Sequence, residues 1–232
     1  MSTPGVPRSV LAVGAHPTDV AYFAGGMLAW LADAGARVTH VVCTDGGHGI
    51  NDGPMLVERR RLEAALAAEA LGADRVVFLN YPDGALSGGE AMCRDLVLEI
   101  RRTRAELVLA HDPTMLWSRV GKVVRLGESD HRIAGQATLD AIQPRAASRS
   151  YYPEITEQGY MPWLVAEVLL FDTPSPDHFF DVTPWREKKR SALAYHASQV
   201  PLRLIEESEA EAEEHAARTG YPAEAFRRLR LI

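Results

Sequence analysis

Short apolar runs alternate along the chain with longer stretches of helical periodicity. The apolar runs cover residues 9–15, 36–44, 75–81, 105–111 and 165–172. Their hydrophobicity is continuous rather than alternating, which is typical of strands covered on both faces of a sheet. Helical patterns lie near 25–34, 55–71, 90–103, 131–142 and 184–197. This order predicts βαβ units and an α/β fold, a Rossmann-like three-layer sandwich with a mostly parallel sheet.

Two segments depart from this alternation. Residues 112–130 form the longest stretch without clear periodicity, and a loop of that length is usually functional or mobile. The tail from about residue 205 indicates two polar helices that divide at Gly220–Pro222, and its acidic run is typical of a solvated helix face. No linker or repeat interrupts the chain, so we expect residues 1–232 to form a single domain with a polar helical C-terminal tail.

Composition narrows the class of protein. The chain has 232 residues, 47% of them hydrophobic, and a formal net charge of −6, which argues against a nucleic-acid partner. No apolar run approaches the roughly 20 residues of a membrane span, and the first residues lack a signal-peptide pattern. We therefore expect a cytoplasmic protein with a small-molecule substrate and no membrane partner, and a homo-oligomeric state is compatible with the sequence. Cys43 and Cys93 are expected to be buried thiols.

Titratable residues gather where predicted strands end, which is where open α/β sheets bind ligands. His16 and Asp19 follow the first strand, and His131 opens a later helix. Two imidazoles and a carboxylate can hold one cation and leave a coordination position open. The alternative is that His16-x-x-Asp19 arises by chance and that Ser129 or Asp130 simply caps a helix.

Several segments in consistent order resemble the PIG-L/LmbE-like family of zinc-dependent N-deacetylases. The first is "AHPTD" at 15–19, where the family typically has "AHPDD" and then a glycine pair that opens a helix. The others are Gly25–Gly26, "TDG" at 44–46, Arg60 with Glu63, "LG" at 71–72, "YPDG" at 81–84, "HDP" at 111–113, "ESDHR" at 128–132, "YPE" at 152–154, a P-x-H at 176–178 and an H-x-S-Q at 196–199. The resemblance runs from about residue 9 to 199.

The resemblance implies that His16, Asp19 and His131 bind a catalytic Zn²⁺. Two histidines and one carboxylate also suit Fe²⁺, so the ligands alone leave the metal open. Two positions depart from the family pattern. The residue that usually acts as general base is Thr18, whose hydroxyl cannot take a proton from metal-bound water at neutral pH. The histidine that usually stabilises the oxyanion is Glu128, a carboxylate that can instead serve as the missing base.

These departures leave three functional hypotheses. In the preferred one, the protein is a zinc-dependent deacetylase that removes an N-acyl group, expected to be acetyl, from an amino sugar or a related small polar amide. In the second, it hydrates an unsaturated oxo-acid, because some relatives of this family are hydratases that also lack the usual base. In the third, it is a catalytically inactive homologue that binds a metal or a ligand.

Four further residues are expected around this site. Asp130 either orients a neighbouring side chain or caps its helix. Arg60 is a candidate for bidentate binding of a substrate oxygen, with a solvated surface arginine as the alternative. Asp45 and His48 lie in a glycine-rich loop where the backbone can approach a substrate closely.

Overall fold

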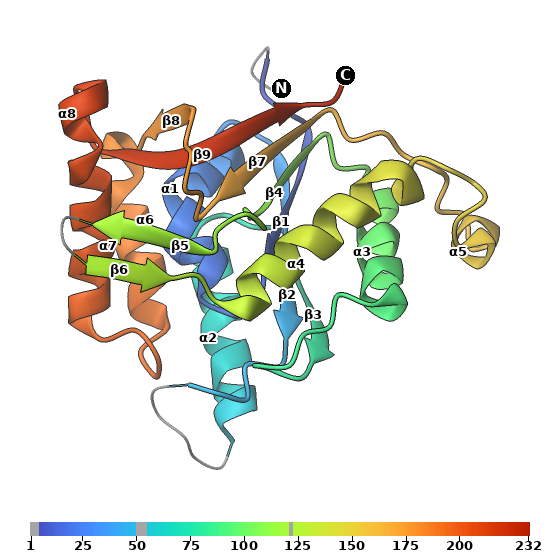
Figure 1. The fold of residues 1–232 in the computed structure, drawn as a ribbon, viewed down its shortest axis with the longest axis horizontal. Helices are drawn as coiled ribbons and strands as arrows, with labels where there is room; N and C mark the ends of the chain where they lie inside the picture. Colours follow the sequence, from blue (N-terminus) through green and yellow to red (C-terminus); the bar gives the residue numbers. More distant parts are fainter. Residues whose placement is uncertain (1–4, 50–54, 121–122) are drawn as a thin grey trace.

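The computed structural model describes residues 5–49, 55–120 and 123–232. A seven-stranded sheet with the order β3-β2-β1-β4-β7-β9-β8 runs through the molecule (Figure 1). Its strands are β1 (Ser9–Gly14), β2 (Arg37–Thr44), β3 (Arg75–Tyr81), β4 (Leu107–His111), β7 (Glu167–Phe171), β8 (His178–Asp181) and β9 (Ala223–Arg230). The pairs β1–β2, β2–β3, β1–β4 and β4–β7 are parallel, and β9 is antiparallel to both of its neighbours. The predicted mostly parallel sheet is confirmed.

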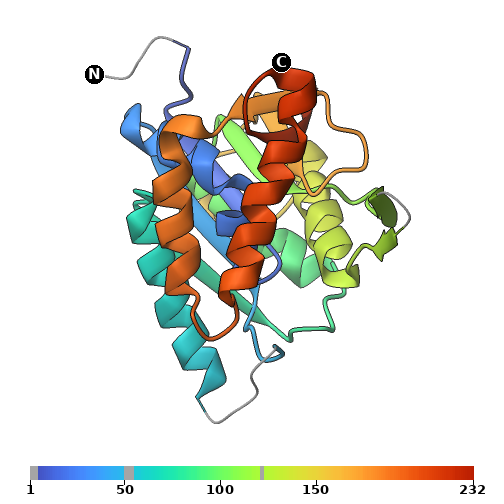
Figure 2. The ribbon, with the colours of Figure 1, turned by 90° about the vertical axis from the view of Figure 1, so that its left-hand side faces the viewer.

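Helices cover both faces of the sheet, so successive residues of the central strands enter different cores. Leu11 and Val13 of β1 pack in a core with residues of α3 (Glu90–Thr103) and α4 (Ser129–Asp140). Val10 and Ala12 pack in a second core with residues of α1 (Asp19–Asp33). In Figure 2 the sheet lies between these layers. Burial of both faces accounts for the continuous apolar runs in the sequence.

A third apolar cluster holds helices to one another on the α1 side. It joins α1, α2 (Leu56–Ala70), α6 (Arg186–Tyr195) and α7 (Leu202–Glu214) through buried residues such as Ala29, Ala67, Leu193 and Ile205. The remaining elements are the π-helical turn Ala141–Ala146, α5 (Pro153–Glu157), the 3-10 turn Thr183–Trp185 and α8 (Ala216–Thr219). Among the described helices none combines the length and apolar character that a membrane crossing requires.

The C-terminal tail differs from the expected helices. Residues Leu202–Glu214 and Ala216–Thr219 are helical, but Ala223–Arg230 forms β9, which fills the gap between β7 and β8. Phe226 is fully buried in the α1-side core. The prediction of a helix rested on the polar composition of the segment and was wrong. The segment is a strand because the side of β7 that faces away from β4 offers it hydrogen-bonding partners. The tail is therefore part of the central sheet and not an appendage.

Two other boundaries are corrected by the structure. The first helix begins at Asp19, six residues before the predicted start near 25, so Gly25–Gly26 lies inside α1 rather than opening it. The segment predicted as a loop at 112–130 contains the antiparallel hairpin β5 (Trp117–Val120) and β6 (Val123–Leu126), and residues 121–122 lie outside the described part. Period-two patterns only four residues long are too short to stand out in the sequence.

The strand order creates the crevice in which a site is expected. β1 lies between β2 and β4. After β1 the chain first builds β2 and β3 on one side, and it then returns to add β4 on the other side. Such a switch point leaves an opening beyond the carboxyl ends of the two adjacent strands. His16 follows β1 and His111 ends β4, so both lie at this opening.

Candidate metal centre

The turn after β1 holds two of the predicted metal ligands in a fixed relation. The backbone N–H of His16 donates to Asp19 Oδ2 over 2.7 Å, and the N–H of Asp19 donates back to the His16 carbonyl over 3.3 Å. Asp19 is the first residue of α1, where the helix dipole favours a negative charge. The strand-to-helix connection therefore determines how the imidazole and the carboxylate are oriented.

The third predicted ligand reaches the same point from the other side of the sheet. His131 lies in the first turn of α4, and its Nε2 is 3.2 Å from His16 Nδ1. Asp19 Oδ1 is 3.5 Å from His131 Nε2, and Asp19 Oδ2 is 3.5 Å from His16 Nδ1. Tetrahedral zinc with ligand bonds near 2.0–2.1 Å separates its ligand atoms by about 3.3 Å. The three side chains thus fit a single small divalent cation.

Carboxylates on the far side of each imidazole orient the two rings. His16 Nε2 lies 3.1 Å from Asp83 Oδ1 and 3.6 Å from Asp130 Oδ2, and His131 Nδ1 lies 3.3 Å from Asp172 Oδ2. When His16 Nε2 and His131 Nδ1 each carry a proton that is shared with these carboxylates, the lone pairs of His16 Nδ1 and His131 Nε2 point towards the space between the three candidate ligands. Such carboxylate–histidine pairs are usual around protein-bound metals.

His111 supports the carboxylate ligand. It is fully buried, its Nε2 lies 2.9 Å from Asp19 Oδ2, and its ring stacks on that of His131 with 3.9 Å between the centroids. Burial, with a smaller contribution from His131, lowers the pKa of His111 to about 4, so the ring is neutral at physiological pH. A neutral His111 donates Nε2–H to Asp19, and its Nδ1 has no partner in the described part of the chain.

The local electrostatics favour a positive charge at the centre of this cluster. Burial opposes protonation of His16, but Asp19 and Asp83 more than offset it and raise the pKa of His16 to about 11. His131 behaves likewise, because Asp19 and Asp172 outweigh burial and raise its pKa to about 9. Burial alone would raise the pKa of Asp19, but the surrounding histidines bring it well below its usual value. A divalent cation would supply that charge without a buried proton.

Glu128 and Thr18, the two positions that depart from the family pattern, flank the three ligands. Glu128 precedes α4, its side chain is 63% exposed, and its Oε2 lies 3.2 Å from His131 Nε2 and 3.8 Å from His16 Nδ1. Thr18 precedes α1 and makes no side-chain capping bond there. Both residues line the same cavity. Hence a carboxylate is present on the solvent side of the cluster, whereas position 18 offers a hydroxyl.

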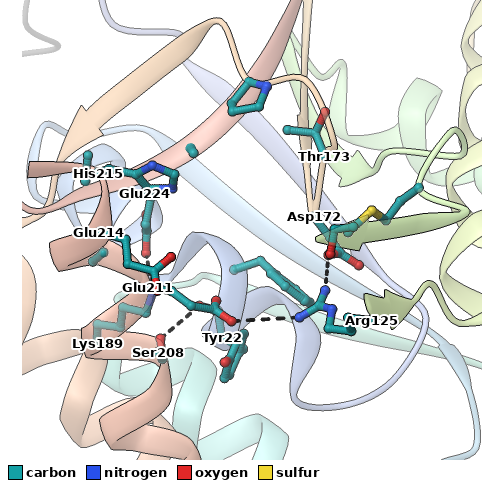
Figure 3. A pocket seen from close by; sticks show the side chains of 17 residues that line it. Tyr22, Arg125, Asp172, Thr173, Lys189, Ser208, Glu211, Glu214, His215 and Glu224 are labelled. Atoms are coloured by element: carbon teal, nitrogen blue, oxygen red, sulfur yellow. Dashed lines mark hydrogen bonds and ion pairs between the residues drawn. The ribbon is translucent and has the colours of Figure 1, made fainter. Parts of the chain in front are cut away.

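A cavity of about 540 Å³ opens above the cluster. Its walls come from α1, the β5–β6 hairpin, the start of α4 and α7; they include Asp19, Glu128, His131, Arg125 and Glu211. A second cavity of about 240 Å³ shares Tyr22, Arg125, Asp172 and Glu211 with it and extends towards β9 (Figure 3). The two volumes are large enough for a small polar molecule.

The residues predicted to bind substrate lie on another side of His16. Arg60 is buried and donates to the carbonyls of Gly46 (2.8 Å) and His48, with Asp83 Oδ2 at 3.4 Å. Asp45 accepts the N–H of Gly47 at 2.9 Å, and His48 is exposed. All of these contacts hold the 45–49 loop together. Arg60, Asp45 and His48 do not line either cavity, and a role for them in substrate binding stays a prediction.

Asp130 contacts the turn after β3 and lies close to His16. Its carboxylate accepts the N–H groups of Gly84 (2.7 Å) and Leu86 (3.3 Å), and it approaches His16. It lies in the first turn of α4, where an acidic residue is favourable. Asp130 therefore joins the start of α4 to the turn after β3 that carries Asp83.

Four contributors to this site were not singled out from the sequence. Asp172 directly follows β7, so the rule that ligands bind beyond strand ends could have found it. Its backbone has a φ of 49°, a left-handed conformation that is uncommon for residues other than glycine. Asp83 stands in the "YPDG" segment. Arg125 and Glu211 gave no local signal, because only the fold brings the hairpin and α7 to the cavity.

The chain is similar in sequence to known deacetylases. A family model described as "PIG-L: GlcNAc-PI de-N-acetylase" matches residues 11–142, which contain all three predicted ligands. The diacetylchitobiose deacetylase of Thermococcus kodakarensis is 30% identical over 198 residues, which cover 84% of this chain and 71% of that protein.

Similarity extends to solved structures and to a second activity. The structure of the N,N'-diacetylchitobiose deacetylase from Pyrococcus horikoshii aligns with a TM-score of 0.85 and 26% identity, over 97% of this chain and 84% of that one. The 4-oxalmesaconate hydratase of Pseudomonas putida is 28% identical, over 87% of this chain and 77% of that protein. This similarity bears on the second hypothesis, hydration of an unsaturated oxo-acid, because Thr18 stands where the family usually has its base.

Proposed function

The chain belongs to the PIG-L family, that of the GlcNAc-PI de-N-acetylase, and from this premise we propose that it removes an acetyl group from the nitrogen of an amino sugar or a related small polar amide. The observation that carries the proposal is the position of the Glu128 carboxylate, 3.2 Å from His131 Nε2 at the open side of the three candidate ligands. That position provides a proton acceptor although Thr18 stands where the family has its base.

The cofactor we propose is one Zn²⁺ held by His16, Asp19 and His131. The spacing of their ligand atoms and the mixture of two nitrogens and one carboxylate support this choice, although Fe²⁺ suits the same donors. When bound, such a cation polarises an amide carbonyl and makes a water molecule more acidic. Asp83, Asp172 and His111 support it by holding the ligands in their reactive orientation.

In the proposed mechanism Glu128 moves the protons. Its carboxylate accepts a proton from the attacking water and returns one to the nitrogen of the leaving amine, as a single general acid–base residue. Its exposure to the cavity gives it access to both positions. Thr18 contributes a hydrogen bond that orients the water or the substrate, since a threonine hydroxyl cannot act as a base at neutral pH.

The charge of the cavity supports deacetylation over hydration of an unsaturated oxo-acid. Six carboxylates line the larger cavity within the described residues, namely Asp19, Glu128, Asp172, Glu207, Glu211 and Glu214. Arg125 is the one lysine or arginine that the structure describes in that lining. An anionic oxo-acid would meet like charges there, whereas a neutral acetamido sugar would find acceptors for its hydroxyl groups.

The test is a substitution that removes the base and keeps its shape. Glu128→Gln in the zinc-loaded protein should lower kcat for acetate release from an N-acetylated amino sugar by about 100-fold or more, which is the usual contribution of a general base. Metal content should stay at the wild-type level. Adding Thr18→Asp should restore part of the rate, because an aspartate there faces the same cavity.

Other results would favour the alternatives. Loss of the metal in Glu128→Gln would make Glu128 a ligand and not a base. Water addition to an unsaturated oxo-acid without acetate release from any amide would indicate a hydratase. Metal binding with neither reaction would indicate a binding homologue.

A further inference from the structure

A buried glutamate on α2 holds the turn that follows α6. Glu63 is 7% exposed, and its carboxylate accepts two hydrogen bonds from Ser198, one from the backbone N–H at 3.0 Å and one from the hydroxyl at 2.6 Å. Arg59, one helical turn earlier, approaches the same carboxylate to 3.1 Å from the surface. The fold thus joins two segments that the sequence singled out separately, the one that ends at Glu63 and the one at 196–199.

This turn forms part of the wall of the larger cavity. The N–H groups of Gln199 and Val200 donate to the His196 carbonyl at 2.9 and 2.8 Å, which closes the turn. Both residues line the cavity, as Thr18 and Asp19 do. A shift of the turn would therefore change the cavity wall beside the candidate metal centre.

The carboxamide of Gln199 occupies space that a glycine leaves open. A Cβ at position 49 would collide with the Gln199 amide, so Gly49 lets the 45–49 loop pack directly against this group. Gln199 is only 6% exposed, although it contributes to the cavity lining. A carboxamide both donates and accepts hydrogen bonds, and so does the acetamido group of an N-acetylated sugar. A Gln199 amide held in one place is therefore suited to recognise that group.

We propose that Glu63 is a positioning residue: through Ser198 it fixes Gln199 at the cavity wall, where the Gln199 carboxamide hydrogen-bonds the acetamido group of the substrate. The inference rests on the proposed function, since it assigns the recognition of the acetamido group in the same cavity. Glu63 itself lines neither cavity, so its effect passes through the turn. A side chain that is already held in place loses less freedom on binding, which increases affinity.

Two substitutions of Glu63 separate the hydrogen bonds from the charge. In Glu63→Ala both donors of Ser198 lose their acceptor, and a buried N–H without a partner is costly, so the turn should shift. In Glu63→Gln the amide oxygen can still accept the N–H of Ser198, and the Ser198 hydroxyl can accept from the amide NH2 group. Glutamine should therefore preserve the position of Gln199, whereas alanine should not.

A binding experiment tests this without requiring catalysis. Zinc-loaded Glu128→Gln protein, in which turnover is suppressed, is titrated calorimetrically with N-acetylglucosamine and with glucose, which lacks the acetamido group. Adding Glu63→Ala should weaken binding of N-acetylglucosamine about tenfold and leave that of glucose unchanged. Gln199→Ala should cause the same loss, and the two substitutions together should cause no more, because Glu63 acts through Gln199. Adding Glu63→Gln should leave both affinities almost unaltered.

A matched control comes from the same helix. Glu69→Ala removes an exposed carboxylate of α2 and should leave both affinities as they are. Zinc content and near-ultraviolet circular dichroism report whether each variant is folded. If Glu63→Ala does not fold, Ser198→Ala removes one of the two hydrogen bonds and should give a smaller loss in the same direction.

Four results would overturn the inference: equal affinity for the two sugars before any change at Glu63, additive losses for Glu63→Ala and Gln199→Ala, a loss for glucose as large as that for N-acetylglucosamine, or a Glu63→Gln protein as impaired as Glu63→Ala. A wild-type protein that releases no acetate, while its variants show the expected pattern of binding, would contradict the proposed function alone.

Discussion

Asp172 illustrates how a single residue outside the recognisable motifs supports the proposed metal centre. Its carboxylate is nearly buried, it lies 3.3 Å from His131 Nδ1, and it also accepts from Arg125. These contacts hold His131 with Nε2 facing Asp19 and His16. The left-handed backbone at Asp172 is maintained by the surrounding structure, which is common where a side chain has a required position.

We predict that Asp172→Asn lowers zinc affinity by about 10- to 100-fold, which is typical for loss of a carboxylate that orients a metal-bound histidine. Competition with a chromophoric chelator measures it. Glu167→Gln, a change at the opposite end of β7, serves as the control and should retain wild-type affinity. Unchanged zinc affinity in Asp172→Asn would mean that His131 does not depend on this contact.

Two buried histidines away from the cavities make stability depend on pH. His40 on β2 and His196 after α6 are buried, their Nε2 atoms have no partner in the described part of the chain, and burial lowers the pKa of each to about 4. The unfolded chain protonates such groups near pH 6.5, so between 6.5 and 4 it binds more protons than the folded protein. The stabilising contribution of these two histidines is therefore fully present above pH 6.5 and is lost as pH decreases through this window.

We predict that the free energy of unfolding falls by up to about 1.4 kcal/mol per pH unit for each of these histidines between pH 6.5 and 5. Urea unfolding of wild type and His40→Leu checks it. In the variant, the free energy of unfolding should decrease less steeply as the pH falls, by about the contribution of one histidine. This holds whatever the stability of the variant at pH 7.5. An identical slope would show that His40 is not held neutral in the fold.

At the scale of elements, α1 and β9 fit together through a glycine. The N–H groups of Gly26 and Met27 each donate to the Glu224 carboxylate at 2.8 Å. A Cβ on Gly26 would lie 2.8 Å from Val182 Cγ1, whereas one on Gly25 would meet the flexible Lys189 side chain at 3.1 Å. The glycine pair thus allows Glu224 and Val182 to approach the middle of a helix.

We predict that Gly26→Ala destabilises the protein by about 1–3 kcal/mol, because overpacking outweighs the gain of about 1 kcal/mol that alanine offers in a helix. Thermal and urea unfolding measure the change. Gly25→Ala is the matched control and should cost clearly less. A Gly26→Ala protein at least as stable as the wild type would contradict the close contact.

Much of the fold was predictable at this scale, and the exceptions have physical causes. β3 and α3 have the predicted bounds because a short apolar run marks the strand and an amphipathic period marks the helix. β9 was mistaken for a helix because its pairing with β7 depends on residues more than 50 positions away. The β5–β6 hairpin was missed because its strands are only four residues long.

The candidate site was predictable to the extent that it follows strand ends and motifs. His16, Asp19 and His131 were named from the sequence, and the fold brings their ligand atoms within 3.5 Å of one another. Arg60 and Asp45 make contacts that hold the 45–49 loop, and their expected role in substrate binding stays a prediction. Arg125 and Glu211 required the tertiary structure.

At the scale of the whole molecule, the sheet order explains why segments so distant in sequence meet. The connection after β1 provides His16 and Asp19 at the switch point, α4 brings His131 from one face, and α7 with the β5–β6 hairpin closes the cavity from the other side. Each part has its own role in the proposed chemistry: the connection after β1 and the start of α4 supply the ligands, Glu128 before α4 is the base, and α7 forms a wall of the cavity.

We propose that the protein hydrolyses an N-acetylated amino sugar with Glu128 as the base, and that His16, Asp19 and His131 would hold the one cation that the reaction requires. Titration of chelator-treated protein with zinc, with acetate release as the readout, tests it most directly. We predict that the rate rises from near zero, reaches its plateau at about one equivalent of zinc, and does not rise in His131→Ala. Acetate release that is independent of zinc, or no release from any N-acetylated amino sugar at full zinc loading, would contradict the account.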